Sequence, residues 1–292
     1  MTKSIFPVLA KMTICGFFCL MMVNKAEAYH ASDSSQKPLL ASRDKDDKGL
    51  YITIEPNVVF PDLLAGNEEQ VMDYVEKFSV NRRDYLIRTY TRSKRFFPKA
   101  AVILKKHHLP QEFSVLLALE SAFNANAVSH AGAVGYWQFM DGTAKEYGLK
   151  VAEQLTAAEK KKLLKAGKKK GEVLIKAKAK QKDDRKNFTR STNAAARYLR
   201  DRGRNLDNDV LLMVASYNCG IGNVWNAMNG SGVGNPTFWD IKENLPAETQ
   251  SYVMNFIALN VIFHNYEKFI DNTLSFKPVK VKLDKEQAGT ID

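Results

Sequence analysis

A single glutamate, Glu120, closes an uninterrupted apolar run, Val115–Leu119. A carboxylate in apolar surroundings is costly when charged, so a fold that contains it must neutralise it, pair it or use it. Desolvation raises the pKa of a carboxyl group, which is how a general acid stays protonated near neutral pH. A dense pattern of small, amide and aromatic residues follows, from Ser121 to Ala144. This run constrains the chain more than any other.

Apolar residues at helical spacing predict a mainly α protein. A helix is expected from about Asn81 to Lys106, with an interruption near Pro98. Weak alternation at Tyr51–Ile54 and in the tail from Phe276 predicts two short strands. The residues expected to begin or cap the helices are Asn67, Asn81, Pro110, Ser191 or Thr192, Asp207 or Asn208, and Pro246.

The N-terminus has the composition of a signal peptide, residues 1–28. Lys3 and Lys11 form a basic start, Met12–Val23 is apolar, and Ala26–Ala28 fits a small-x-small cleavage site. The apolar stretch is shorter than the roughly 18 residues that a membrane-spanning helix needs. We therefore expect a periplasmic or secreted mature protein, with an uncleaved N-terminal anchor as the alternative. Cleavage would remove Cys15 and Cys19 and leave Cys219 without an intrachain disulfide partner.

The net charge of +11 is concentrated in one segment. Residues 150–186 hold fourteen Lys or Arg and five Asp or Glu, and no Phe, Tyr or Trp. Without aromatic residues to stack on bases, nucleic acid is a poor partner. The segment is expected to be a helical hairpin that is either a solvated face or an electrostatic dock for wall polymer or a membrane surface.

The residues after Glu120 suit a neutral, hydroxyl-rich ligand. Ser129, Gln138 and Asn218 carry side chains that bind the hydroxyl and acetamido groups of a sugar, and Trp137 and Tyr217 offer apolar ring faces or core packing. No pair of histidines lies at i,i+4 and Cys219 has no cysteine partner, so no metal site is predicted. No phosphate loop or nucleophile elbow is present, and no cofactor is expected.

Four motifs in order resemble those of the soluble-type lytic murein transglycosylases of the goose-type lysozyme superfamily. The resemblance covers roughly residues 65–270, and the helices around Arg92 and Leu109 most resemble the membrane-bound transglycosylase D group. It implies a mainly α, lysozyme-like (goose-type) fold with an N-terminal helical extension. The motifs are the run from Glu120 to Ala144, the block from Asp184 to Leu199, Ser216–Gly222, and Leu245–Val253.

The resemblance also implies a division of the chain and roles for its residues. A flexible lead-in (29–64) would precede the transglycosylase domain (65–270), which contains a basic insertion (151–182), and a tail (271–292) would follow. Glu120 matches the family's single catalytic acid/base. The protein should be a monomer that acts on peptidoglycan glycan strands without a cofactor. Positions matching glycan-cleft residues are Ser129, Gln138, Met140, Tyr217, Asn218 and Tyr252.

The expected reaction is non-hydrolytic cleavage between N-acetylmuramic acid and N-acetylglucosamine, giving 1,6-anhydromuramoyl ends. Asp141 stands where the family usually has proline and adds a possible second carboxylate. It therefore leaves open a hydrolytic lysozyme, because a second carboxylate can activate water. A non-catalytic peptidoglycan-binding protein is the third alternative. No wall-binding repeat follows residue 270, so targeting is expected to depend on the basic insertion.

Overall fold

The computed structural model describes residues 41–46, 49–152, 157–170, 172–173 and 182–282. The expected signal peptide, the start of the lead-in and parts of the basic insertion lie outside these residues. The described residues divide into two compact units, one of residues 84–259 and one of residues 41–83 with 260–282. The domain expected over residues 65–270 contributes to both units.

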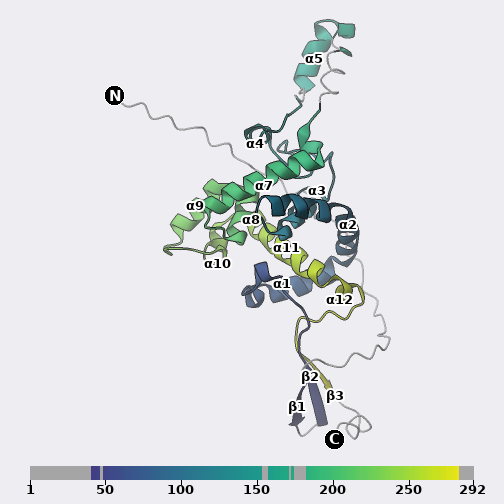
Figure 1. Ribbon diagram of the computed structural model, residues 1–292, viewed down its shortest axis with the longest axis vertical. Coiled ribbons are helices and arrows are strands. Elements are labelled where there is room, and N and C mark those ends of the chain that lie inside the picture. Colours follow the sequence, from purple (N-terminus) through teal and green to yellow (C-terminus); the bar gives the residue numbers. More distant parts are fainter. Residues whose placement is uncertain (1–40, 47–48, 153–156, 171, 174–181, 283–292) are drawn as a thin grey trace. The chain divides into compact units, whose positions relative to one another are not determined.

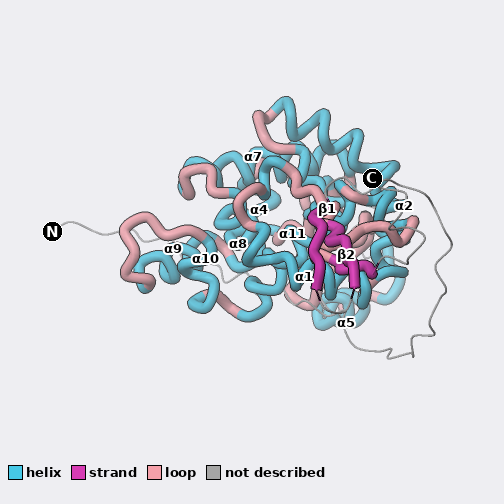
Figure 2. The backbone as a smooth tube through the Cα atoms, turned by 90° about the horizontal axis from the view of Figure 1, so that it is seen from below, coloured by secondary structure: helices cyan, strands magenta, loops and turns pink. Residues whose placement is uncertain are grey.

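The smaller unit combines an antiparallel sheet, in the order β1-β2-β3, with short helices (Figure 2). The two expected strands are present as β2 and β3. The third, β1, lies in the expected lead-in and has a polar sequence, but backbone pairing with β2 needs no apolar side chain. The elements of the smaller unit are β1 (Ala41–Asp46), β2 (Gly49–Ile54), η1 (Asp62–Leu64), α1 (Glu68–Asn81), α12 (Tyr266–Ile270) and β3 (Val279–Lys282).

All regular elements in the described residues of the larger unit are helices (Figure 1), and two isolated β-bridges join Val134 to Val128 and to Phe139. This confirms the mainly α architecture. No helix among the described residues is long and apolar enough to cross a membrane. The elements are α2 (Arg83–Lys106), η2 (Gln111–Val115), α3 (Leu116–Ser121), α4 (Asp141–Glu146), α5 (Ala157–Lys165), η3 (Asp184–Lys186), α7 (Phe188–Asn205), α8 (Val210–Cys219), α9 (Ile221–Gly230), α10 (Phe238–Ile241), η4 (Lys242–Asn244) and α11 (Ala247–His264).

Three local predictions were wrong. Helix α2 continues through Pro98, which is exposed, so that water can satisfy the backbone carbonyl left without its N–H partner. Helix α7 is capped by Asn187, whose side chain accepts from the backbone N–H of Arg190, and not by Ser191 or Thr192. Helix α8 is capped by Asp209, one or two residues after the expected positions.

Helix α8 is the central helix of the larger unit (Figure 1). Every residue from Leu211 to Cys219 is buried, and the helix packs against α7, α9 and α10. A helix that is apolar on all sides belongs in an interior. The chain leaves α8 at Gly220, whose φ of +82° favours glycine, and enters α9 directly. The end of α8 therefore places Tyr217 and Asn218 inside the fold.

Candidate active site

Glu120 lies in the last turn of α3, where the buried face of the helix gives way to a half-buried position. Leu116, Leu117 and Ala118 are buried and anchor the helix. The chain then turns through two residues in left-handed conformation, Ala122 (φ +46°) and Phe123 (φ +64°). Ala122 ends the helix as its left-handed C-cap, and non-glycine residues in this conformation cluster at active sites and ligand clamps.

Tyr252 of α11, 132 residues after Glu120 in the chain, contacts the Glu120 side chain. Its hydroxyl donates a 2.5 Å hydrogen bond to Oε1 of Glu120. Burial raises the pKa of Glu120 to about 8; the hydrogen bond from Tyr252 opposes that rise and the charge of Glu248 adds to it. Burial and the nearby Glu120 also raise the pKa of Tyr252 well above its usual value, so that Tyr252 remains a donor. Glu120 is therefore protonated at neutral pH, and the hydrogen bond leaves its Oε2 for other partners.

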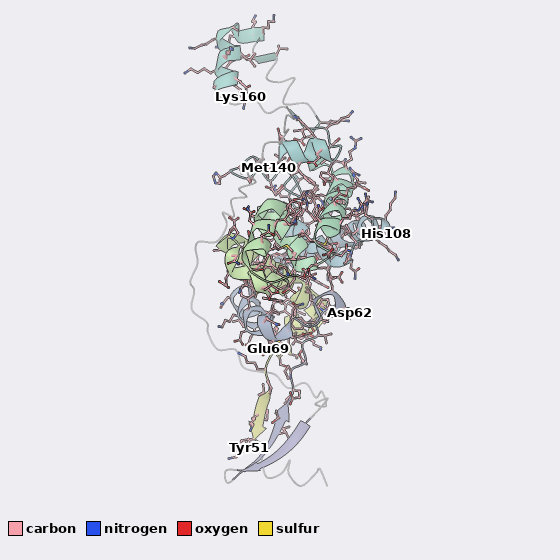
Figure 3. The ribbon with its side chains drawn as sticks, turned by 90° about the vertical axis from the view of Figure 1, so that its left-hand side faces the viewer. Tyr51, Asp62, Glu69, His108, Met140 and Lys160 are labelled. Carbon is pink, nitrogen blue, oxygen red and sulfur yellow. The ribbon has the colours of Figure 1, made fainter. Side chains whose placement is uncertain are left out.

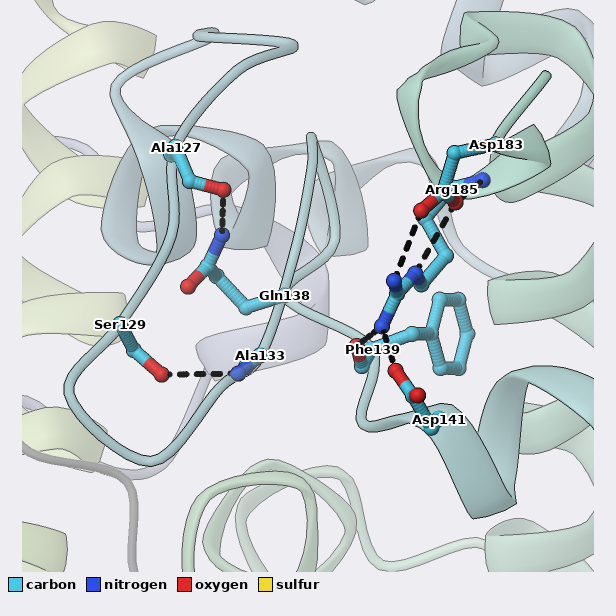
Figure 4. A network of polar contacts seen from close by, with 8 residues as sticks. All are labelled: Ala127, Ser129, Ala133, Gln138, Phe139, Asp141, Asp183 and Arg185. Carbon is cyan, nitrogen blue, oxygen red and sulfur yellow. Dashed lines mark hydrogen bonds and ion pairs between the residues drawn. The ribbon is translucent and has the colours of Figure 1, made fainter. Parts of the chain in front are cut away.

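The loop after α3 folds back on that helix. The Ser121 hydroxyl donates to the carbonyl of Tyr136 at 2.9 Å, which ties the loop to the helix that carries Glu120. Within the loop, Ser129 Oγ accepts from the backbone N–H of Ala133 at 3.0 Å (Figure 4). Ser129 and Met140 are both half-buried. The Ser129 oxygen therefore accepts a hydrogen bond that shapes the loop.

Gln138 is buried and has a φ of +46°, in the left-handed region. Its side-chain amide nitrogen donates to the carbonyls of Gly135 at 2.8 Å and Ala127 at 3.2 Å. Because those bonds fix the nitrogen, the amide oxygen points the other way (Figure 4). Gln138 thus presents an acceptor in a fixed orientation.

Trp137, Tyr217 and Asn218 are buried and bonded within the protein. Trp137 donates to Thr192 Oγ1 at 2.9 Å, and Tyr217 donates to the carbonyl of Trp137 at 2.8 Å. Asn218 Oδ1 accepts from Thr249 Oγ1 at 2.7 Å. Trp137 is fully buried, so it is a core residue and not a platform for a sugar. Tyr217 still belongs to the surroundings of Glu120. Burial raises the pKa of Tyr217, and the charge of Glu120 adds to that rise.

Asp141 lies in an ion pair with Arg185. Its carboxylate pairs with Nη1 of Arg185, a buried guanidinium that also donates to the carbonyl of Phe139 at 3.3 Å and to Asp183 at 2.7 Å (Figure 4). These contacts fix the position of the Asp141 side chain at Arg185. The environment of Asp141 therefore differs from that expected of a second catalytic carboxylate.

The sequence analysis missed two features. Glu248 is the carboxylate whose charge acts on Glu120, and it lies one turn before Tyr252 on α11, at the i,i+4 spacing that places residues on one face. The second is the Arg185 network, which joins residues separated in sequence by the basic insertion. The i,i+4 spacing was readable from the sequence, whereas the Arg185 network was not.

The basic insertion begins and ends at one point of the fold. The backbone N–H of Asp184 donates to the carbonyl of Lys150 at 2.8 Å, and the N–H of Lys150 donates to Asp184 Oδ2 at 3.0 Å. Between them, the lysines of α5 and of residues 168–170 are exposed, including Lys160 (Figure 3). The described part of the expected hairpin contains α5 and further helical residues at 168–170 and 172–173, and the remainder lies outside the described residues.

Comparison with known proteins agrees with the motifs. Residues 99–236 match the family model of the transglycosylase SLT domain. Membrane-bound lytic murein transglycosylase D from two strains of Escherichia coli is 29% identical over 203 residues, 69% of this chain and 38% of the relative. The chain therefore spans well under half the length of those relatives.

Among solved structures, the 70 kDa soluble lytic transglycosylase of Escherichia coli is similar with a TM-score of 0.41 and 18% identity, over 76% of this chain and 39% of that one. A lytic transglycosylase Slt from Pseudomonas aeruginosa gives 0.40 and 19%, over 66% and 26%. The family match thus agrees with the ordered motifs, and residues 99–236 of this chain are similar to a transglycosylase SLT domain.

Proposed function

We propose that this protein is a peptidoglycan lytic transglycosylase that cleaves the bond between N-acetylmuramic acid and N-acetylglucosamine without water. The observation that carries the proposal is the environment of Glu120: a half-buried carboxyl group with a pKa of about 8, held by one short hydrogen bond from Tyr252. A catalytic acid needs a pKa near the working pH.

In the first step, neutral Glu120 acts as the acid. Tyr252 donates to Oε1, so the proton resides on Oε2 and passes to the oxygen that links the two sugars. The bond between this oxygen and C1 of the muramic acid breaks, and positive charge develops at C1 and the ring oxygen. The fixed amide oxygen of Gln138 is a neutral dipole suited to holding the substrate during this step.

In the second step, the Glu120 carboxylate acts as the base. It removes the proton from the 6-hydroxyl of the muramic acid, whose oxygen closes on C1 to form the 1,6-anhydro ring. One proton is donated and one is recovered, so Glu120 ends as it began and no water or cofactor is consumed. A group with a raised pKa is also a stronger base once ionised, which serves this step.

We assign the remaining predicted residues either to direct contact with the substrate or to support of the residues that make that contact. Ser129 and Met140 are half-buried and, with Gln138, belong to the loop tied to α3, so they are candidates for direct contact with the glycan. Tyr217 and Asn218 are buried and support the site through the Trp137 carbonyl and Thr249. Because its substrate is the cell wall, the protein would act outside the cytoplasm.

We also propose that the basic insertion holds the protein to its polymeric substrate, whose stem peptides carry carboxylates. Its exposed lysines are spread along α5 and residues 168–170. Attraction between exposed charges is screened by salt, with a Debye length of about 8 Å at physiological ionic strength. Binding to intact sacculi should therefore weaken as salt rises.

The test is mass spectrometry of products released from purified sacculi. The wild type should release muropeptides with anhydro ends, each one water lighter than the corresponding reducing product. Glu120→Gln keeps an acceptor for Tyr252 but cannot donate the proton, so it should release none. Reducing ends would indicate a lysozyme instead, and full release by Glu120→Gln would contradict the assignment of the catalytic acid.

A further inference from the structure

A segment that follows the residues of the candidate site in the sequence carries no charge. Residues 210–239 contain no Asp, Glu, Lys, Arg or His, in a chain of which 26% of residues are charged. For α8 the reason is burial. Helix α9 and residues 231–237 are largely exposed, however, and exposed segments of this chain are otherwise rich in charge. Burial therefore does not explain why this surface is neutral.

One side of α9 is built into the fold and the other is open. Val224 and Ala227 are buried. Ile221, Trp225 and Met228 share a different stripe at i, i+4 and i+7, and they are half-buried or exposed. The Trp225 side chain is 44% exposed, and within the described part of the chain it makes no contact with another aromatic ring.

Three asparagines lie on the same helix, and Asn229, four residues after Trp225, shares its face. Asn223, Asn226 and Asn229 recur every three residues and are all exposed. An aromatic face offers apolar contact to the C–H face of a sugar ring, and amides both donate to and accept from hydroxyl and acetamido groups. The absence of charge disfavours ionic polymers and favours a neutral polysaccharide. The surface, defined as Ile221–Gly230, is thus matched to an uncharged N-acetylated glycan.

The surface is continuous with the candidate site along the chain. Helix α9 starts two residues after Cys219, and the preceding turn of α8 carries Tyr217, whose pKa responds to Glu120. At a rise of 1.5 Å per residue, Trp225 lies only about 6 Å along α9 from Ile221. This short path along the chain is the reason to assign α9 to the part of the glycan strand that extends beyond the cleavage site.

We propose that α9 is an additional glycan-binding surface, in which Trp225 stacks on an N-acetylated sugar remote from the bond that is cleaved. This rests on the proposed transglycosylase function and adds to it a preference for long strands. Binding energy from remote sugars would then favour extended glycan over short fragments.

The test uses Glu120→Gln as the background, so that substrate is bound without turnover. Calorimetry would compare Trp225→Ala with the parent, using as probes a long chain of β-1,4-linked N-acetylglucosamine, which carries no charge, and the disaccharide of the same sugar. The dissociation constant for long strands should rise about tenfold, and that for the disaccharide should not change. Trp225→Phe, which keeps an aromatic face, should recover part of the loss.

Equal binding of long strands by Trp225→Ala and the parent would overturn the inference, as would equal loss for both probes. Because Trp225 is exposed, the melting temperature should be unchanged, which excludes misfolding as the cause. The failure of the two proposals is distinguishable. If the otherwise wild-type protein releases anhydro products and Trp225→Ala cleaves long strands equally well, only the role of α9 is wrong. If the wild type releases no products, the transglycosylase function itself is wrong.

Discussion

The hydroxyl of Tyr252 lies 2.5 Å from Oε1 of Glu120, and its hydrogen bond lowers the pKa of a carboxyl group that burial raises to about 8. The two residues are 132 positions apart in the chain and come from α3 and α11. Their contact sets both the orientation of the proposed acid and the pH range over which it stays protonated.

Tyr252→Phe should move the alkaline limb of the pH–rate profile to higher pH. Glu120 must be protonated for the first step, so activity is lost as pH rises through its pKa. Loss of the hydrogen bond removes a contribution that lowers this pKa. We expect kcat to fall about 10–100-fold, because the acid is less well oriented. Tyr147→Phe, which also removes a hydroxyl bonded to a carboxylate, Asp201, is the control and should leave the profile unchanged.

Glu248→Gln should move the same limb in the opposite direction. The negative charge of Glu248 raises the pKa of Glu120, so its removal lowers that pKa and activity is lost at a lower pH. Glu248 is exposed and solvent screens its charge, so the shift should be less than about one pH unit. Glu243→Gln is a matched exposed control. A shift to higher pH, or an equal shift in both variants, would contradict this role.

Glu120→Gln should stabilise the fold, and more so at alkaline pH. The folded-state pKa is about 8 and the ordinary value is 4.5, so between these values the unfolded chain ionises while the folded one resists. Stability therefore falls as pH rises through this window, and the glutamine removes that loss. We expect a gain of about 1–3 kcal/mol in unfolding free energy at pH 8 and almost none at pH 4. Urea unfolding at both pH values measures it; a gain that does not depend on pH would show another cause.

Gly135→Ala should destabilise the loop that carries Gln138. Gly135 has a φ of +86°, and a Cβ there would lie 2.1 Å from the carbonyl oxygen of Arg185, a backbone atom that cannot move aside cheaply. We expect a loss of about 3 kcal/mol or more. Gly132→Ala is the control, because Gly132 has nearly the same φ of +88° but open space around it, so its cost should be about 1–2 kcal/mol. Equal unfolding midpoints for the two variants would contradict the packing explanation.

Deleting residues 151–182 should separate attachment to the wall from catalysis. Lys150 and Asp184 are hydrogen-bonded to each other, so a short Gly-Ser linker can rejoin the chain. The deletion removes eleven Lys and three Glu. Activity on intact sacculi at low salt should fall, and activity on short soluble fragments should not. Equal loss on both substrates would mean that the segment is structural.

The sequence predicted much of the helical architecture and the proposed acid because those features are local. Helical spacing gave α1 and the Pro246-opened α11, and the apolar run identified Glu120. The capping predictions at Ser191 and Asp207 failed because several nearby residues could serve, and backbone geometry selected Asn187 and Asp209. Amino-acid propensities do not decide which of several neighbouring residues caps a helix.

The partners of the site residues could not be predicted, because they are set by tertiary packing. Asp141 follows Met140 in sequence and was a possible second carboxylate; its ion-pair partner, Arg185, comes 44 residues later. Trp137 was a candidate for sugar contact until packing against Thr192 and Tyr217 placed it in the core. Burial of a given aromatic residue depends on what the rest of the chain brings to it.

Lys150 and Asp184 hold the two ends of the insertion together whatever the chain does between them. Lengthening a loop whose ends are fixed costs little free energy, because each doubling of its length adds only about 0.6 kcal/mol of closure entropy. The segment between these two residues can therefore change in length and composition at little cost in free energy, while the loop that carries Gln138 stays intact.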